Sequence, residues 1–220
     1  MSTAPGAVPR LRFAVEEAGV LEHAAAPTLR FLLRVESVGG EAIRSVQLNA
    51  MIRIAAARRG YAPAEQERLL DLFGEPPRWG TTLKSLFWTQ SNLTVPAFEG
   101  SSLVEVPVAC TYDFEVASAK YFHALREGVV PLEILFSGTF FYSGPDGALR
   151  TGRISWEEEA DFALPVEVWR AAMERYFPGS AWLRLRSDAF ERLYRYRARN
   201  ALPSWEHALE ALLGAAGEEA

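Results

Sequence analysis

The sequence VEVPVACTYDF, residues 104–114, is the longest unbroken alternation of apolar and other side chains in the chain. Successive side chains of a β-strand point to opposite faces, so a period of two predicts a strand with one buried face. Further strands are predicted on both sides of it, at residues 11–17, 28–37, 43–58, 81–95, 129–142 and 149–162. The part of the chain between residues 10 and 164 is therefore predicted to be a β domain.

Turn sequences join two pairs of these strands. Val38-Gly39-Gly40-Glu41 lies between strands 28–37 and 43–58, and Ser143-Gly144-Pro145-Asp146-Gly147 lies between strands 129–142 and 149–162. Short segments of glycine, proline and aspartate between strands are typical of antiparallel hairpins. We therefore expect a largely antiparallel β-sheet or sandwich in which each of these two pairs forms a hairpin.

The spacing of apolar residues becomes helical after residue 164. A helix with an apolar stripe from Val166 is predicted to begin at Pro165, and further helices are predicted to start at Ser187 and Ser204. Shorter helices are expected as insertions at residues 63–73 and 116–127. Strands first and helices last is the order of an α+β protein. The predicted organisation is a disordered N-terminus at 1–9, a β domain at 10–164, C-terminal helices packed on it at 165–214 and a disordered tail at 215–220.

Composition narrows the class of function. The 220 residues carry a formal net charge of -5, which argues against a dedicated nucleic-acid binder because phosphate neutralisation supplies most of that affinity. No segment approaches the roughly 18 consecutive apolar residues of a membrane span, and the first residues lack the pattern of a secretory signal. We therefore expect a cytoplasmic protein that binds neither nucleic acid nor membrane.

A nucleophilic site could be drawn from the single cysteine, Cys110, with His123 as base and Asp113 as orienting acid. Cys110 is in phase with the buried face of its predicted strand, where an apolar environment raises the thiol pKa and blocks access. Core packing is therefore the favoured interpretation. The sequence also lacks a glycine-rich phosphate loop and a GxSxG nucleophile elbow, so no catalytic residue and no cofactor are predicted.

Metal binding has weak support in the sequence. The three histidines are far apart and there is no second cysteine, so the ligand spacings of zinc sites are absent. Four carboxylates near the end of the last predicted strand could bind a hard cation: Glu157, Glu158, Glu159 and Asp161. Solvated charges that discourage edge pairing are the favoured interpretation, and no metal is predicted.

The stretch Arg184–Arg199 holds six arginines against two carboxylates, with two tyrosines among them. Such a helix could bind an acidic partner or an RNA backbone. A solvated helix face in an arginine-rich protein is the favoured interpretation, since arginines far outnumber lysines along the whole chain.

Large aromatic side chains crowd near turns and helix ends. They either seal the junction between sheet and helices or form an exposed apolar surface for a client chain. The candidate partner-binding residues are Trp79, Phe87, Trp88, Phe98 and Trp182.

A set of short motifs runs along nearly the whole chain. They include Leu72-Phe73-Gly74, Val95-Pro96-Ala97-Phe98, Cys110-Thr111-Tyr112-Asp113-Phe114, Leu135-Phe136-Ser137-Gly138-Thr139 and Tyr176-Phe177-Pro178-Gly179. Together they resemble an uncharacterised bacterial family, a domain of unknown function, over about residues 10–213. The resemblance implies a gene position near high-affinity uptake nickel-iron hydrogenases, and hence an accessory or assembly role. The order of strands and helices is also loosely similar to that of the SecB export chaperone, which binds unfolded chains along aromatic grooves.

The function expected from these observations is that of a non-enzymatic protein-binding accessory factor, chaperone-like or scaffold-like. Its expected partner is a protein, and the resemblance implies a subunit of an uptake nickel-iron hydrogenase during assembly. One alternative is an enzyme or small-ligand-binding protein that uses a cavity between sheet and helices. The other is a structural subunit of a homo-oligomeric assembly.

Overall fold

The computed structural model describes residues 8–111, 113, 116–181 and 183–217. The chain forms two compact units, residues 1–181 and residues 182–220. In the described residues, no helix is long and apolar enough to cross a membrane.

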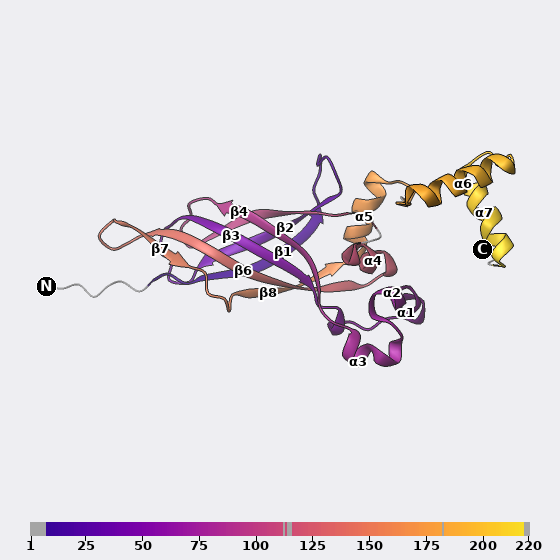
Figure 1. Cartoon of the computed structure of the whole chain (residues 1–220). Helices are drawn as coiled ribbons and strands as arrows, with labels where there is room; N and C mark the ends of the chain where they lie inside the picture. Colours follow the sequence, from indigo (N-terminus) through magenta and orange to yellow (C-terminus); the bar gives the residue numbers. More distant parts are fainter. Residues whose placement is uncertain (1–7, 112, 114–115, 182, 218–220) are drawn as a thin grey trace. The chain divides into compact units, whose positions relative to one another are not determined.

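The first unit is built on two antiparallel β-sheets (Figure 1). The smaller sheet has the order β1-β2-β5 and contains β1 (Leu11–Val20), β2 (Thr28–Ser37) and β5 (Ser101–Ala109). Its inward side chains follow the predicted alternation, since Leu29, Phe31, Leu33 and Val35 of β2 are all buried.

The larger sheet has the order β4-β3-β6-β7, and its strands are also antiparallel. It contains β3 (Ile43–Ile54), β4 (Leu86–Val95), β6 (Val129–Ser143) and β7 (Leu149–Arg153). A further strand, β8 (Glu159–Pro165), pairs with the first half of β6. The long strand β6 is therefore central, with β3 along one side and β7 and β8 in turn along the other.

The two sheets pack face to face around one core. The rings of Phe13 on β1 and Phe136 on β6 stack at 4.4 Å between centroids. The ring of Phe31 on β2 meets Phe162 on β8 edge to face at 5.8 Å. Aromatic pairs in these arrangements add to the free energy of burial. The unit is a β-sandwich, and the predicted α+β class with a largely antiparallel sheet and C-terminal helices is confirmed.

The predicted hairpin between β2 and β3 is wrong. Strand β2 pairs with β1 and β5, whereas β3 pairs with β4 and β6, so the chain crosses from one sheet to the other between them. Gly40, at φ 77°, provides the left-handed residue in this crossing. Side-chain alternation is a local property and is the same whether two successive strands pair or face one another across a core. The second predicted hairpin, β6 with β7, is confirmed.

Several predicted strands are too long. The strand predicted to reach residue 58 ends at Ile54 and is followed by the 3-10 helix η1 (Ala56–Arg58). The strand predicted at 104–114 ends at Ala109, and the one predicted at 149–162 is split into β7 and β8. Glu158 lies at that split, buried, where its carboxylate accepts a hydrogen bond from Arg10 Nε at 2.9 Å.

Helices gather at one end of the sandwich (Figure 1). The segment between β3 and β4 forms α1 (Pro63–Arg68), α2 (Leu70–Phe73), the 3-10 helix η2 (Pro76–Arg78) and α3 (Trp79–Thr82). The strand predicted to start at residue 81 therefore begins only at Leu86. The same end of the sandwich carries α4 (Ala117–Ala124) and α5 (Val166–Tyr176).

A buried ion pair ties this helical end together. Arg59 Nη2 donates to Glu65 Oε1 at 2.7 Å, and the two side chains are only 12% and 6% exposed. Glu65 also accepts hydrogen bonds from the backbone N–H groups of Ala62, at 3.1 Å, and Arg126, at 3.3 Å. One carboxylate thus joins the residue after η1, the start of α1 and the loop that follows α4.

The second unit is a pair of helices, α6 (Ser187–Arg199) and α7 (Trp205–Ala216). Ser204 caps α7 by accepting a hydrogen bond from the His207 backbone N–H at 3.3 Å. The guanidinium of Arg197 lies 4.6 Å from the ring centroid of Trp205 and so stacks across the turn between the helices. The three helices predicted after residue 164 are therefore all present, as α5, α6 and α7. The predicted domain boundaries stay a prediction.

Candidate functional site

Trp79, the first predicted partner-binding residue, lies in an aromatic cluster at the helical end of the sandwich. Its ring meets Tyr61 edge to face at 5.3 Å and Phe73 at 6.1 Å. Its indole Nε1 donates to the carbonyl oxygen of Gly74 at 2.7 Å. Trp79 thus packs partly buried against the core, with its polar group satisfied.

Phe87 and Trp88 point to opposite sides of β4. A bulge lies between the pairs Ile52 with Thr89 and Arg53 with Phe87, so one extra residue, Trp88, interrupts the register. Trp88 is turned inward, where its ring lies 4.8 Å from that of Phe122. Phe87 is turned outward and is 59% exposed.

Phe98 and Trp182 complete the predicted set. Phe98 forms an antiparallel bridge with Ile43, and its side chain packs partly buried against the core. Trp182 lies outside the described residues. Trp79, Trp88 and Phe98 therefore pack against the core of the first unit. Phe87 is the exposed one among the four predicted residues that are described. That the five bind a partner stays a prediction.

Cys110 is buried at the end of β5, with 8% of its surface exposed. Burial raises the pKa of its thiol to about 12. A thiol that remains protonated at neutral pH is a poor nucleophile, so this environment suits core packing.

Two of the carboxylates around β8 form ion pairs with arginines. Glu158 pairs with Arg10 at 2.9 Å, and Asp161 pairs with Arg58 at 2.7 Å. Among the described residues, no three His, Cys, Asp or Glu side chains lie together as metal ligands would.

The second unit carries an apolar groove that the sequence reasoning did not identify as a site. The groove has a volume of about 490 Å³ and is formed by the segment before α6 and by both helices. Its lining is Leu183, Leu185, Ala189, Arg192, Leu193, Tyr196, Leu209 and Leu212. The leucine stripe of α7 was visible in the sequence, but its period predicts only an apolar face and not what covers that face.

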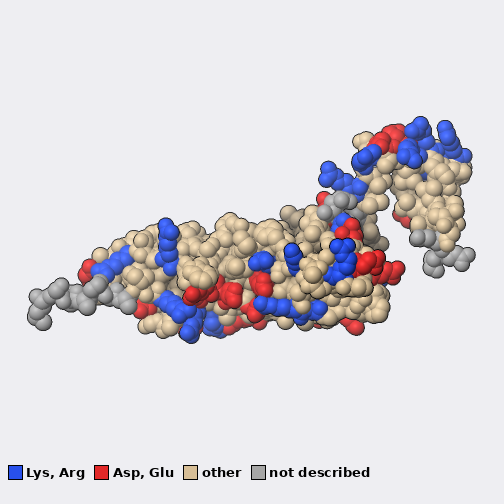
Figure 2. Space-filling view, turned by 60° about the horizontal axis from the view of Figure 1, so that its bottom comes forward, with Lys and Arg blue, Asp and Glu red and all other residues tan. Residues whose placement is uncertain are grey.

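The described residues of this unit bury very little of that face. Ala208 is the one side chain of α6 and α7 that is fully buried. Leu183 is 68% exposed, Leu209 is 41% exposed and Leu212 is 39% exposed. Arginines gather on this unit (Figure 2), and one of them, Arg192, lines the groove itself. The unit therefore combines uncovered leucines with positive charge.

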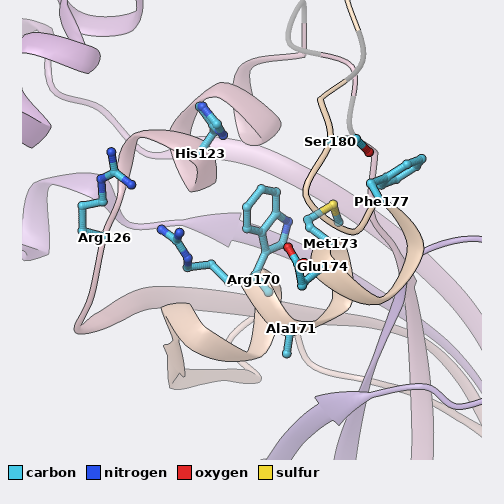
Figure 3. Close-up of a pocket in the computed structure, with 9 residues that line it drawn as sticks. His123, Arg126, Arg170, Ala171, Met173, Glu174, Phe177 and Ser180 are labelled. Atoms are coloured by element: carbon cyan, nitrogen blue, oxygen red, sulfur yellow. The ribbon is translucent and has the colours of Figure 1, made fainter. Parts of the chain in front are cut away.

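A second concave site lies within the first unit, between α4 and α5 (Figure 3). It has a volume of about 370 Å³. Its lining is His123, Arg126, Trp169, Arg170, Ala171, Met173, Glu174, Phe177 and Ser180. None of the four carboxylates considered as a cation site, Glu157, Glu158, Glu159 and Asp161, is among these lining residues.

Comparison with known protein families decides the classification. The sequence matches the family of unknown function DUF6084 over residues 8–220. The chain belongs to DUF6084. The match spans both units, so the α6–α7 pair is part of what defines a DUF6084 protein. The sequence-based resemblance to an uncharacterised family is confirmed at this level.

Solved structures show distant likenesses to this DUF6084 chain. A protein proposed to be a late embryogenesis abundant (LEA) protein is 14% identical, with 72% of this chain and 73% of that chain covered and a TM-score of 0.33. A protein from Bordetella pertussis proposed to be ApaA is 12% identical, with coverage of 71% and 93% and a TM-score of 0.23. A β-glucosidase from Kluyveromyces marxianus is 10% identical over 71% of this chain and 15% of the enzyme, with a TM-score of 0.25. No curated protein matches the sequence.

Proposed function

We propose that this protein is a non-enzymatic, protein-binding accessory factor that acts as a scaffold, and that the α6–α7 unit binds its partner. The sandwich is the rigid body of this scaffold, and the groove of the helical unit is the docking surface. The predicted aromatic residue Phe87, exposed on β4, is a second point at which a partner could touch the sandwich.

The observation that carries the proposal is the uncovered apolar face of α6 and α7. Folding units of fewer than about 40 residues rarely bury enough surface to be stable without disulfides, metals or association. Residues 182–220 contain no cysteine, and their two helices fully bury only Ala208 among the described residues. We therefore infer that the α6–α7 unit is stabilised by association with a partner that covers its apolar face.

Charge indicates what kind of segment fits the groove. The stretch Arg184–Arg199 holds six arginines against two carboxylates, and Arg192 lines the groove itself. A partner segment with leucine-like side chains on one face and carboxylates at its border would match both features. Helix-in-groove recognition of this kind uses anchors at helical spacing. We therefore propose an acidic, amphipathic helix of the partner as the occupant.

The partner protein proposed is a subunit of an uptake nickel-iron hydrogenase during assembly. This part of the proposal is supported by the family resemblance in the sequence, which implies a gene position near such hydrogenases. A scaffold is favoured over SecB-like capture of unfolded chains, because most described members of the predicted aromatic surface pack against the sandwich core.

The test is affinity purification of the tagged full-length chain from its host under hydrogenase-inducing conditions, with mass spectrometry and native mass determination. Leu212→Asp places a carboxylate in the groove, and Leu213→Asp is the matched control on the same helix outside the groove lining. We expect hydrogenase subunits at fixed stoichiometry with the unmodified chain and the control, and their loss with Leu212→Asp. Equal recovery with both variants, or recovery of no hydrogenase subunit, would contradict the proposal.

A homo-oligomeric structural role is the second candidate, and the charges of the helices favour it specifically. Helix α6 has four arginines against two carboxylates, whereas α7 has Glu206 and Glu210 and no lysine or arginine. Two copies related by a two-fold axis could place α6 of each against α7 of the other. In the same experiment, a native mass of two chains that falls to one in Leu212→Asp would identify this arrangement.

A further inference from the structure

The pocket between α4 and α5 combines an apolar floor with a basic rim. Trp169 and Met173 form the floor and are only 4% and 5% exposed, so their positions are fixed by the core beneath them. Phe177 extends the apolar wall beyond the end of α5. Figure 3 shows the guanidinium groups of Arg126 and Arg170 converging on one side of the pocket, with His123 above them on α4.

Both arginines are held by contacts that leave donors available to a ligand. Arg170 Nη1 donates to the carbonyl oxygen of Leu125 at 3.3 Å, which fixes one nitrogen of its five-donor fork. Arg126 is fixed through its backbone, whose N–H donates to the buried carboxylate of Glu65 at 3.3 Å. The ion pair between Glu65 and Arg59 thus supports the wall of the pocket.

Positive charge accumulates in this pocket. Burial lowers the pKa of His123, and the nearby guanidinium groups of Arg68, Arg126 and Arg170 lower it further. Glu174 is the one carboxylate among the described lining residues, and its Oε1 accepts a hydrogen bond from the Gly179 backbone N–H at 3.1 Å. The carboxylate of Glu174 is therefore engaged by the loop after α5.

We propose that this pocket binds a small organic anion, with a phosphate or carboxylate group on Arg126 and Arg170 and a ring or chain on Trp169, Met173 and Phe177. Guanidinium groups present paired donors that match the oxygens of both anions. An apolar wall with a few convergent polar groups is the usual character of a small-ligand site. This site is separate from the helical groove, so it stands whether or not the proposed protein partner is correct.

The experiment is isothermal titration calorimetry of the full chain with phenyl phosphate, benzoate, inorganic phosphate and benzyl alcohol at constant ionic strength. We expect saturable binding of phenyl phosphate or benzoate, and which of the two binds more tightly distinguishes a phosphate from a carboxylate ligand. Inorganic phosphate and benzyl alcohol, which each lack one half of the recognised group, should bind at least about tenfold more weakly.

Two variants and one control locate the binding. Arg170→Gln and Arg126→Gln should each weaken the binding of the better probe by about tenfold or more, because each removes charged hydrogen bonds. Arg175→Gln removes an exposed arginine of the same helix outside the pocket lining and should leave the affinity unchanged. Circular dichroism verifies that each variant is folded. No saturable binding of either aromatic anion up to 10 mM, roughly the weak limit for a specific site, or equal losses in all three variants, would overturn the proposal.

Discussion

Replacing Glu65 with alanine should strongly destabilise the sandwich unit, because it breaks the buried ion pair at the helical end. Glu65 accepts hydrogen bonds from Arg59 and from two backbone N–H groups, and its side chain is 6% exposed. The substitution leaves the guanidinium of Arg59, itself 12% exposed, without its counter-charge. Breaking a buried pair in this way costs about 3–5 kcal/mol.

The assay is thermal unfolding followed by circular dichroism at neutral pH. For a unit of this size, each kcal/mol shifts the midpoint by about 2–4 °C, so a fall on the order of 10 °C is expected. Glu67→Ala, an exposed carboxylate of the same helix, is the matched control and should leave the midpoint unchanged.

A second variant separates the loss of the pair from the loss of packing. Glu65→Leu combined with Arg59→Met removes both charges and keeps apolar volume, so the part of the loss caused by the unpaired guanidinium should return, whereas the part caused by the lost hydrogen bonds to the backbone should remain. A midpoint for Glu65→Ala within 2 °C of the unmodified chain, which corresponds to about 1 kcal/mol or less, would refute the role given to this ion pair.

Three further predictions concern the sandwich. Gly138→Ala should lower the unfolding midpoint more than Gly147→Ala. A Cβ at Gly138 overlaps a backbone carbonyl of β3, whereas a Cβ at Gly147 meets open space. Equal melting curves would contradict this prediction. Trp88→Ala should lower the free energy of unfolding by about 3 kcal/mol, because it empties part of the core. Phe87→Ala should leave the unfolding midpoint unchanged, because its side chain is exposed. The reverse order would show that the bulge in β4 is misplaced. Because burial raises the pKa of Cys110 from about 9 to about 12, the free energy of unfolding should fall as the pH rises through this range, where the thiol ionises only in the unfolded chain. Cys110→Ala should reduce that fall, and native protein at pH 8 should react with iodoacetamide far more slowly than urea-unfolded protein, whereas similar rates would show an accessible thiol.

The element types were predictable from the sequence because side-chain period is set by local geometry. The alternation in β2 and β3 and the change to helical spacing after residue 164 correctly predicted strands followed by helices. The pairing of strands was harder to predict, because an alternating strand has the same sequence pattern in either sheet. The segment around Gly40, where the chain crosses between the sheets, was therefore predicted to be a hairpin turn.

The candidate sites were harder to predict, for physical reasons that differ between them. A bulge of one residue decides that Trp88 faces the core and Phe87 faces outward, and the period of β4 does not reveal it. The basic pocket depends on Arg126 and Arg170, which come from separate segments of the chain and line one pocket only in the folded unit. The groove depends on how little α6 and α7 bury against one another, which an apolar stripe does not indicate.

Hydrogen exchange, followed by mass spectrometry, of the isolated chain and of the chain with its captured partner tests directly whether the apolar face of α6 and α7 binds a partner. Amides of α6 and α7 should exchange at low opening free energies in the isolated chain, far faster than those of β3 and β6, because this pair of helices has almost no core. Partner binding should protect them. Protection of α6 and α7 equal to that of β3 in the isolated monomer would contradict the claim that their apolar face awaits a partner.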